Sequence, residues 1–463
     1  MTLQQPSPPA PSDPAERERV SHTALRRRLL YSCHERDLDE LMQTQLGRVR
    51  KSAWGKPDLT ANPYLSLWSQ TAMLYSAEPE VVAPDAAGEE LLGAVTMAGL
   101  WPLMQRVQRD TLALREMAVH VGVEAGELVY RPVFPDLMEA TASKARPSSP
   151  VAIREWRWVD GVWLRFVASI EDPSAPVYRV EDRAGMDVSK DVLGGSFAGD
   201  AYPYRGADGA PLLPYVLYHA AETGYLWDPY TLREVVEGSL NIGLLLTYYQ
   251  HVVRNAAYSQ RYVVGVEVDG AEGVTADGVS SARREVVTDP STLLMLRQAE
   301  DASQPIIGQW SPPVDPESLL RSVSMYERRI LTMAGLAPPD VTRQEADVRS
   351  GYSLAVARES VREAQRVSEP MFRRGDLELL RVSAAMLGAD RGRQIPGDGY
   401  RINYRGLPPS PIERAAEREQ VVALMAAGLL GRVEAYQRLN PGVTEAQASA
   451  EVARIAAENR ATA

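Results

Sequence analysis

The sequence contains one cysteine, Cys33, among its 463 residues. A single thiol excludes an intramolecular disulfide framework and a zinc site built on cysteine pairs, and it is typical of a reducing compartment. Long hydrophobic runs are also missing, because the longest, around residues 240–249, is far shorter than the roughly 20 residues that cross a bilayer. We therefore expect no membrane span and no membrane partner.

Sequence signatures of catalysis and nucleotide binding are absent as well. The chain has no P-loop, no Gly-x-Gly-x-x-Gly after a strand, no His-Glu-x-x-His and no Gly-x-Ser-x-Gly. Five histidines are dispersed without metal-ligand spacing: His22, His34, His120, His219 and His251. The chain has 61 acidic residues, so sequence alone cannot single out an acid–base pair. We expect no catalytic site, no cofactor and no metal.

The composition predicts a globular protein of two or three domains, with 45% hydrophobic and 24% charged residues. A formal net charge of −11 disfavours a protein that wraps nucleic acid with a basic surface. The arginine run at 26–28 is expected to be mainly a solvated helix face. Residues 1–11 are rich in proline, serine and glutamine, which predicts a disordered tail rather than a signal peptide.

The hydrophobic pattern of residues 315–387 predicts two helices separated by a polar loop, and this is the central feature of the sequence. Asp315-Pro316 is a helix start, since Asp is a good N-cap and Pro is tolerated at the first helical position. Gly335 supplies a stop, and the proline-containing, charged segment 336–350 then predicts a loop. The apolar stripe resumes over 351–387, which predicts a long helix.

Pro370 lies inside this long helical pattern, and Gly375 follows it closely. Because proline removes one internal hydrogen bond and clashes with the preceding turn, a kink is expected near this point. A pair of ordinary core helices would give the same spacing, and the pattern does not separate these two interpretations.

The first half of the chain predicts mixed helix and strand. Asp13-Pro14 is a second helix start, and 91–121 reads as one or two helices interrupted near Pro102. Alternating apolar residues over 151–167 surround Asp160-Gly161 and predict a hairpin with a two-residue turn. Tryptophans in this hairpin are expected to serve packing. Residues 211–217 read as a short edge strand, since its prolines cannot donate to a ladder.

Asp228-Pro229 predicts another helix, which carries small residues that would allow close helix contacts: Gly238, Gly243, Ala256 and Ala257. A compact β-rich insertion, 261–310, lies between this helix and the one at Asp315. Beyond the long helix, 400–405 predicts a strand. Three helices then close the chain, two of them opened by capping boxes at Ser410 and Thr444.

This order of elements resembles the portal protein of tailed bacteriophages with double-stranded DNA, the head–tail connector. The resemblance covers most of the chain and is carried by these stretches: 214–218 leading into 232–260, Tyr326 to Met333, Ser350 to Leu354, and Ile402 to Arg405 followed by 413–441. It implies an α+β fold with a mixed wing, a helical stem, a small β-rich clip, a long kinked helix and a C-terminal helical crown.

Mapped onto this chain, the resemblance implies the following parts: a disordered tail at 1–11, the wing at 12–227 with strand 400–405, stem helix 1 at 228–260, the clip at 261–310, stem helix 2 at 311–335, a tunnel loop at 336–350, the long wing helix at 351–387, a connector with the wing strand at 388–409, and the crown at 410–463.

The function that the resemblance implies is a homo-oligomeric ring, usually of twelve subunits, at one capsid vertex of the virion. It is assembled in the host bacterial cytoplasm and conducts double-stranded DNA, independently of sequence, during packaging and ejection. The implied partners are further copies of the chain, the large terminase subunit that drives packaging, a head-completion or adaptor protein, and the major capsid and scaffolding proteins. No enzymatic activity and no cofactor are implied.

Charged residues of the tunnel loop are then candidates to face DNA: Asp340, Arg343, Glu345, Asp347 and Arg349. The arginines would make weak, sequence-blind phosphate contacts, while the acids prevent tight binding. Two alternatives stay open on the sequence. One is a ring or scaffold protein that is not a portal, and the other is an enzyme, most plausibly a hydrolase, whose site is built from dispersed residues.

Overall fold

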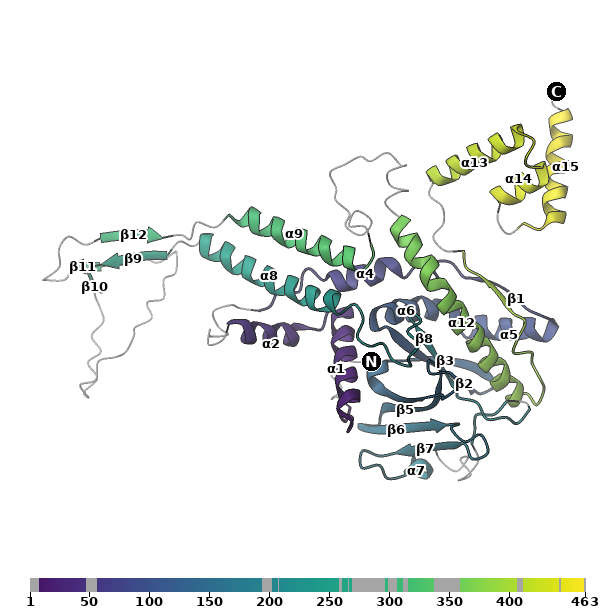
Figure 1. Ribbon diagram of the computed structural model, residues 1–463, viewed down its shortest axis with the longest axis horizontal. Helices are drawn as coiled ribbons and strands as arrows, with labels where there is room; N and C mark the ends of the chain where they lie inside the picture. Colours follow the sequence, from purple (N-terminus) through teal and green to yellow (C-terminus); the bar gives the residue numbers. More distant parts are fainter. Residues whose placement is uncertain are drawn as a thin grey trace. The chain divides into compact units, whose positions relative to one another are not determined.

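The computed structural model contains both helices and antiparallel sheets, in agreement with the expected α+β class (Figure 1). It describes residues 8–46, 56–193, 202–206, 208–257, 260–264, 266–268, 296–298, 306–310, 315–336, 359–405, 411–440 and 443–461. The chain forms two compact units. The first comprises Met1–Cys33, Pro63–Val236 and Leu331–Ala463, and the second comprises His34–Asn62 and Glu237–Ile330.

The first unit contains most of the helices: α1 (Pro14–Leu30), α4 (Pro63–Thr71), α5 (Ala86–Met97), α6 (Leu100–Leu114), α7 (Ser189–Leu193), α12 (Glu359–Asp390), α13 (Pro411–Ala426), α14 (Arg432–Leu439) and α15 (Glu445–Ala461). The start of α1 is as predicted, because Asp13 Oδ1 accepts a hydrogen bond from the Ala15 N–H at 3.2 Å. The capping box of α15 is also confirmed. Thr444 and Gln447 exchange hydrogen bonds between side chain and backbone.

Two antiparallel sheets form the core of the first unit. One has the strand order β4 (Met138–Ala142), β5 (Pro150–Val159), β6 (Val162–Ser169), β7 (Val177–Glu181), and the other has β3 (Glu127–Val133), β2 (Glu116–Glu124), β8 (Tyr215–His219). A buried cluster joins both sheets: Ala118, Val133, Met138, Ile153, Ala168, Leu213 and Tyr215. An edge strand is present as predicted, but β8 covers Tyr215–His219 rather than 211–217, so Pro211 and Pro214 precede it. A further pair joins β1 (Glu80–Val82) to β13 (Arg401–Asn403), which confirms the strand expected near 400–405.

The hairpin of β5 and β6 has the predicted Asp160-Gly161 turn. Both residues have positive φ, at 46° and 87°, which is the type I′ geometry that matches the twist of the strands. Trp158 and Trp163 lie opposite each other, with ring centroids 5.3 Å apart in an edge-to-face arrangement. Packing therefore accounts for these tryptophans, as expected.

The prediction of helix throughout 91–121 is wrong at its C-terminal end. Arg115 has a φ of 78°, which ends α6, and β2 begins at Glu116. Met117 continued the helical spacing of the preceding apolar residues by coincidence, whereas the following valines alternate as a strand requires. The expected interruption near Pro102 is confirmed, because α5 ends at Met97 and α6 begins at Leu100. Pro102 itself lies in the first turn of α6, where proline is tolerated.

The second unit is built on α2 (Glu35–Leu46), α8 (Arg233–Ala257, which starts in the first unit) and α9 (Pro316–Met333, which ends in the first unit). At Gly238 of α8, a Cβ atom would stand 2.7 Å from Ile330 Cδ1 of α9, and at Gly243 it would stand 2.9 Å from Leu38 of α2. These two glycines therefore let α9 and α2 approach α8 within one chain.

Short antiparallel strands follow α8 and precede α9. β9 (Gln260–Val264) pairs with β12 (Ile306–Trp310), and β10 (Val266–Val268) pairs with β11 (Leu296–Gln298). The expected β-rich insertion is therefore confirmed in the part that the structure describes. The predicted start of the following helix, α9, is confirmed by a hydrogen bond from the Glu317 N–H to Asp315 Oδ1.

Candidate functional site

The predicted channel residues lie outside the described ranges: Asp340, Arg343, Glu345, Asp347 and Arg349. Their role stays a prediction. The long helix is confirmed from Glu359 to Asp390, and it continues through Pro370 without a break. The kink at Pro370 stays a prediction, as does the structure of residues 351–358.

Gly375 has a packing role that the sequence did not indicate. A Cβ atom at this position would lie 2.3 Å from Cε1 of Tyr218, whose side chain on β8 is almost completely buried. Glycine therefore lets α12 contact the ring of Tyr218 directly, and this contact brings the phenol to the neighbouring residue, Asp376.

Asp376 is the acceptor of a buried cluster of three tyrosines. Its Oδ2 accepts hydrogen bonds from Tyr75 at 2.7 Å and from Tyr404 at 2.6 Å, and its Oδ1 accepts one from Tyr218 at 2.9 Å. Burial raises the pKa of the Asp376 carboxyl to about 6, although the three phenols act in the opposite direction. The cluster thus ties α12 to β8, to the segment after α4 and to the segment after β13.

A second buried carboxylate in the same unit is held by cations instead. Glu155 on β5 forms ion pairs with Arg131 on β3 and with Arg157 on its own strand, and it also accepts a hydrogen bond from Tyr215 at 2.9 Å. Burial disfavours its charge, yet the two arginines prevail and lower the pKa of Glu155 to about 2. The network joins the two sheets.

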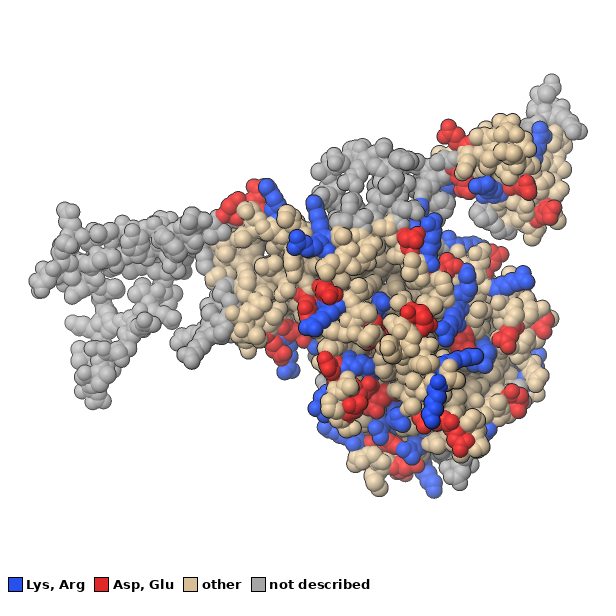
Figure 2. All heavy atoms as spheres, viewed as in Figure 1, with Lys and Arg blue, Asp and Glu red and all other residues tan. Residues whose placement is uncertain are grey.

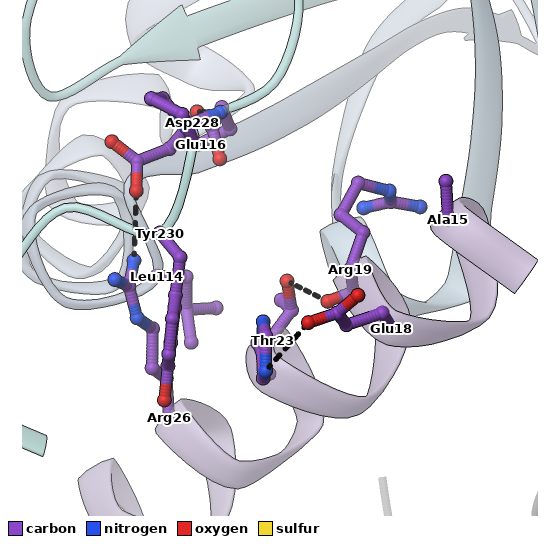
Figure 3. Close-up of a pocket in the computed structure, with 11 residues that line it drawn as sticks. Ala15, Glu18, Arg19, Thr23, Arg26, Leu114, Glu116, Asp228 and Tyr230 are labelled. Atoms are coloured by element: carbon purple, nitrogen blue, oxygen red, sulfur yellow. Dashed lines mark hydrogen bonds and ion pairs between the residues drawn. The ribbon is translucent and has the colours of Figure 1, made fainter. Parts of the chain in front are cut away.

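A cavity of about 230 Å³ lies where α1 faces the start of β2 and the segment before α8 (Figure 3). Figure 3 shows Arg19, Thr23 and Arg26 projecting from α1, with Glu116 and Asp228 across from them. The ring of His22 stacks on that of Tyr230 at 3.7 Å. The cavity is the best candidate for a small polar site in the described part of this unit.

Asp228 is the centre of this cavity's interactions, and its side chain is only 4% exposed. Its carboxylate lies 3.5 Å from Arg26 Nη1 and 3.6 Å from Arg115 Nε, and it accepts hydrogen bonds from the N–H and hydroxyl of Thr231. Its own N–H donates to Glu116 Oε1 at 2.6 Å. These contacts hold the turn that leads into α8.

Two expectations are corrected here. Asp228-Pro229 does not start a helix, because α8 begins at Arg233 and the Asp228 side chain is turned inward to the arginines. The arginine run is not simply a solvated face. Arg26 is buried against Asp228, and Arg27 pairs at 2.9 Å with the buried carboxylate of Asp136.

The electrostatics of this cavity favour a retained proton. Burial, together with the charge of Asp228, raises the pKa of Glu116 to about 8, although the Asp228 N–H, Arg115 and Arg26 act in the opposite direction. Burial also lowers the pKa of His22. The Glu116 carboxyl, with its raised pKa, lies beside Asp228 and Arg26, and this arrangement offers polar groups to a small polar ligand.

Sequence reasoning missed Glu116, Asp376 and their partners. Tyr75 and Tyr404 are far from Asp376 along the chain, and Glu116 is far from Asp228, so no local spacing connects them. The one signal in the sequence was an acid that directly follows a glycine within a helical pattern, Gly375-Asp376, and this pattern is too common to select a site.

Groups of three or more His, Cys, Asp or Glu side chains that could hold a metal ion are not found among the described residues. Within the described ranges, no helix has the length and apolar character needed to span a membrane.

No family model and no curated protein matches the sequence. Among solved structures, the chain is similar to one in "Virion of native gene transfer agent (GTA) particle", with 14% identity and a TM-score of 0.44, over 88% of this chain and 94% of that chain. It is also similar to a chain in "Neck of native GTA particle computed with C12 symmetry", with 14% identity and a TM-score of 0.43 over the same shares. A third similar chain belongs to "Neck of empty GTA particle computed with C6 symmetry", with 14% identity and a TM-score of 0.44, over 82% of this chain and 90% of that chain.

Proposed function

We propose that the chain is the portal subunit of a phage-like particle. In this proposal it forms a ring at one capsid vertex and conducts double-stranded DNA during packaging and ejection. The observation that carries the proposal is the α8–α9 pair, whose helices pack in opposite directions through Gly238 and Ile330 and are joined through a small antiparallel β module. With the long α12 next along the described chain, this is the stem, clip and long-helix order of portals.

Exposed apolar side chains on α9 support assembly into a ring. Large apolar residues are 37–63% exposed on this one helix: Leu319, Leu320, Met325 and Met333. A soluble monomer rarely leaves so many together on one element, whereas a neighbouring copy would cover them. The stem is therefore the surface at which we place contact between copies.

The charge distribution suits a conduit rather than a binder of DNA. The net charge of −11 per subunit repels DNA at long range, and phosphate binding strengthens with each cation that a surface offers. Figure 2 shows Lys and Arg interspersed with Asp and Glu on the face in view, so DNA would meet no extended basic surface there. The tunnel loop, 336–350, would supply the weak contacts.

The proposed partners follow from the same assignment. They are further copies of this chain, usually twelve in all, the large terminase subunit, a head-completion or adaptor protein, and the capsid and scaffolding proteins. The proposal includes no catalytic step and no cofactor. It places the chain at the virion vertex after assembly in the bacterial cytoplasm.

Negative-stain images of the purified protein test the proposal. We expect rings with a central hole wide enough for duplex DNA. Monomers would contradict it, and rings whose hole cannot admit a duplex would favour a non-portal ring or scaffold protein.

The double variant Arg343→Glu, Arg349→Glu tests the tunnel loop in particle assembly. We expect capsids with normal portal content and reduced packaged DNA, because acidic loops repel phosphates. The control is Arg183→Glu with Lys190→Glu, which makes the same charge change at exposed positions beside β7 and α7. Wild-type DNA content in the loop variant would remove these residues from the mechanism.

The alternative of a hydrolase with a dispersed site would place that site at Glu116 and Asp228, where an acid with a raised pKa lies beside a second acid in a cavity. The same atoms, however, hold the Thr231 turn and the segment before α8. We therefore assign them a structural role.

A further inference from the structure

Among the described residues, no strand pairs with the side of β8 that faces away from β2, so this edge of the sheet is open. Pairs 121–214 and 115–220 are hydrogen-bonded across β2 and β8, so by alternation the peptide groups of Tyr215, Leu217 and His219 point away from β2. The described residues place no strand on that side of β8. Open edges of this kind are templates for another strand, and proteins usually block them.

This edge lines a groove of about 320 Å³, which is within the range of ligand sites. Ile170, Leu213 and Leu217 form an apolar wall from the sheet side, and Met371 and Val382 contribute from α12. His219 Nε2 lies 3.1 Å from the carbonyl oxygen of Ser148, which attaches the β4–β5 connection to the end of β8. The groove is thus bounded by the connection, the strand and the helix.

Cations predominate at the rim. Arg146, Arg374 and Arg381 line the groove together with one acid, Glu378, among the described residues. Arg374 pairs with Glu222 at 3.0 Å and Arg381 pairs with Glu378 at 2.5 Å, and all four side chains are about half exposed. Such exposed pairs are weak and exchange readily with an incoming carboxylate. Arg146 is exposed, and its guanidinium makes no ion pair within the described chain.

We propose that this groove binds an extended, acidic peptide segment of another protein, which adds a strand to β8. The free N–H and C=O groups of β8 can pair with the backbone of another extended segment. The apolar walls of the groove would contact every second side chain of that segment. Arg146, Arg374 and Arg381 would attract its acidic residues. The proposal does not depend on ring formation, so it can fail or hold independently of the portal assignment.

The test uses full-length protein and a fluorescent six-residue peptide of alternating Asp and Val with blocked ends. Binding is measured by anisotropy at low salt. We expect saturable binding, at least tenfold weaker binding after N-methylation of the alternate residues whose N–H groups would face β8, and little change after N-methylation of the others. Methylation that has no effect in either set, or no saturable binding, would overturn the proposal. A lysine–valine peptide should bind at least tenfold more weakly.

Variants of the protein give the second arm. Arg146→Glu should weaken binding at least threefold, whereas Arg183→Glu, on another exposed turn of the same unit, should not. Leu217→Pro removes an N–H that points into the groove and takes none from the β2 ladder, so it should abolish binding while circular dichroism stays unchanged. If this variant unfolds, the comparison of the two sets of N-methylated peptides with the wild-type protein tests the proposal instead.

Two further measurements test the occupant. Hydrogen exchange of the Leu217 and His219 amides in the free protein should be fast and should slow when the peptide binds. Slow exchange without peptide would mean that this chain fills its own groove. A concentration-dependent dimer that Leu217→Pro abolishes would mean that a second copy fills it, and either result overturns the assignment to another protein.

Discussion

At the residue scale, the contact of Gly375 with Tyr218 shows how closely α12 approaches β8. The Tyr218 ring lies where a side chain at 375 would begin, and its hydroxyl donates to the next residue, Asp376. The space that glycine leaves therefore determines whether the carboxylate reaches its three donors.

Gly375→Ala should destabilise the first unit by about 1–3 kcal/mol, because the Tyr218 ring is buried and has to move. The matched control is Gly93→Ala in α5, where no atom lies within 4 Å of the added Cβ. That change should stabilise by about 0.5–1 kcal/mol through helix propensity. Urea unfolding measures both. Equal effects of the two variants would contradict the packing role.

The Asp376 carboxyl should make stability depend on pH in a defined direction. Its pKa is raised from 3.8 to about 6 on folding, so the folded chain keeps the proton longer than the unfolded chain does. The stabilisation by this proton is complete below about pH 4 and is lost as the pH rises through 6. Between these limits the free energy of unfolding of the wild type, minus that of Asp376→Asn, should fall by about 3 kcal/mol. A difference that is flat or rises with pH would contradict the shift.

Residue roles were predictable from the sequence only where neighbours in the chain determine them. Asp160 and Gly161 form the predicted turn, because a type I′ turn requires only that its two central residues adopt positive φ. Asp376 and Glu116 were missed because their partners come from distant segments. The same reason explains Arg26, which was read as solvated and is buried against Asp228.

At the element scale, proline in α12 gives a direct test. Pro370 lies inside the helix, where it removes one hydrogen bond and crowds the preceding turn, at about 3 kcal/mol. Pro370→Ala should therefore raise the melting temperature. If a bend at Pro370 sets the ring, the variant should also change ring diameter or subunit number in negative-stain images.

The control for this variant is Pro316→Ala in α9, at the first helical position, where proline costs nothing. It should leave both properties unchanged. A higher melting temperature with unchanged rings for Pro370→Ala would mean that the proline has no part in assembly.

Helix starts show where element prediction succeeds and fails. Asp13-Pro14 and Asp315-Pro316 behave as N-caps followed by a tolerated proline. Asp228-Pro229 has the same local pattern, and its carboxylate accepts hydrogen bonds from Thr231, but it also lies beside Arg26 and Arg115 and the helix begins only at Arg233. Tyr230 and Leu232 adopt positive φ before α8 begins. Tertiary ion pairing overrode the local signal.

At the scale of the whole molecule, the β module between α8 and α9 is the part most separable from the rest. Deleting Tyr262 to Ile307 and joining the helices by a short linker should leave the first unit folded, since its two sheets lie elsewhere in the chain. We expect the variant to lose rings or binding of the packaging motor. Rings of normal size that still recruit the motor would remove this segment from assembly.

The pairing of β1 with β13 has a consequence for biosynthesis. Val81 lies opposite Ile402, and Tyr404 is one of the three donors to Asp376. Strand β1 and the hydroxyl of Tyr75 therefore cannot complete their contacts until residues near the end of the chain have been made. At about 5–20 residues per second, the ribosome needs tens of seconds to make the intervening segment. The first unit therefore completes these contacts only after nearly all of the chain has been synthesised, and until then the nascent chain exposes strand edges and apolar surface.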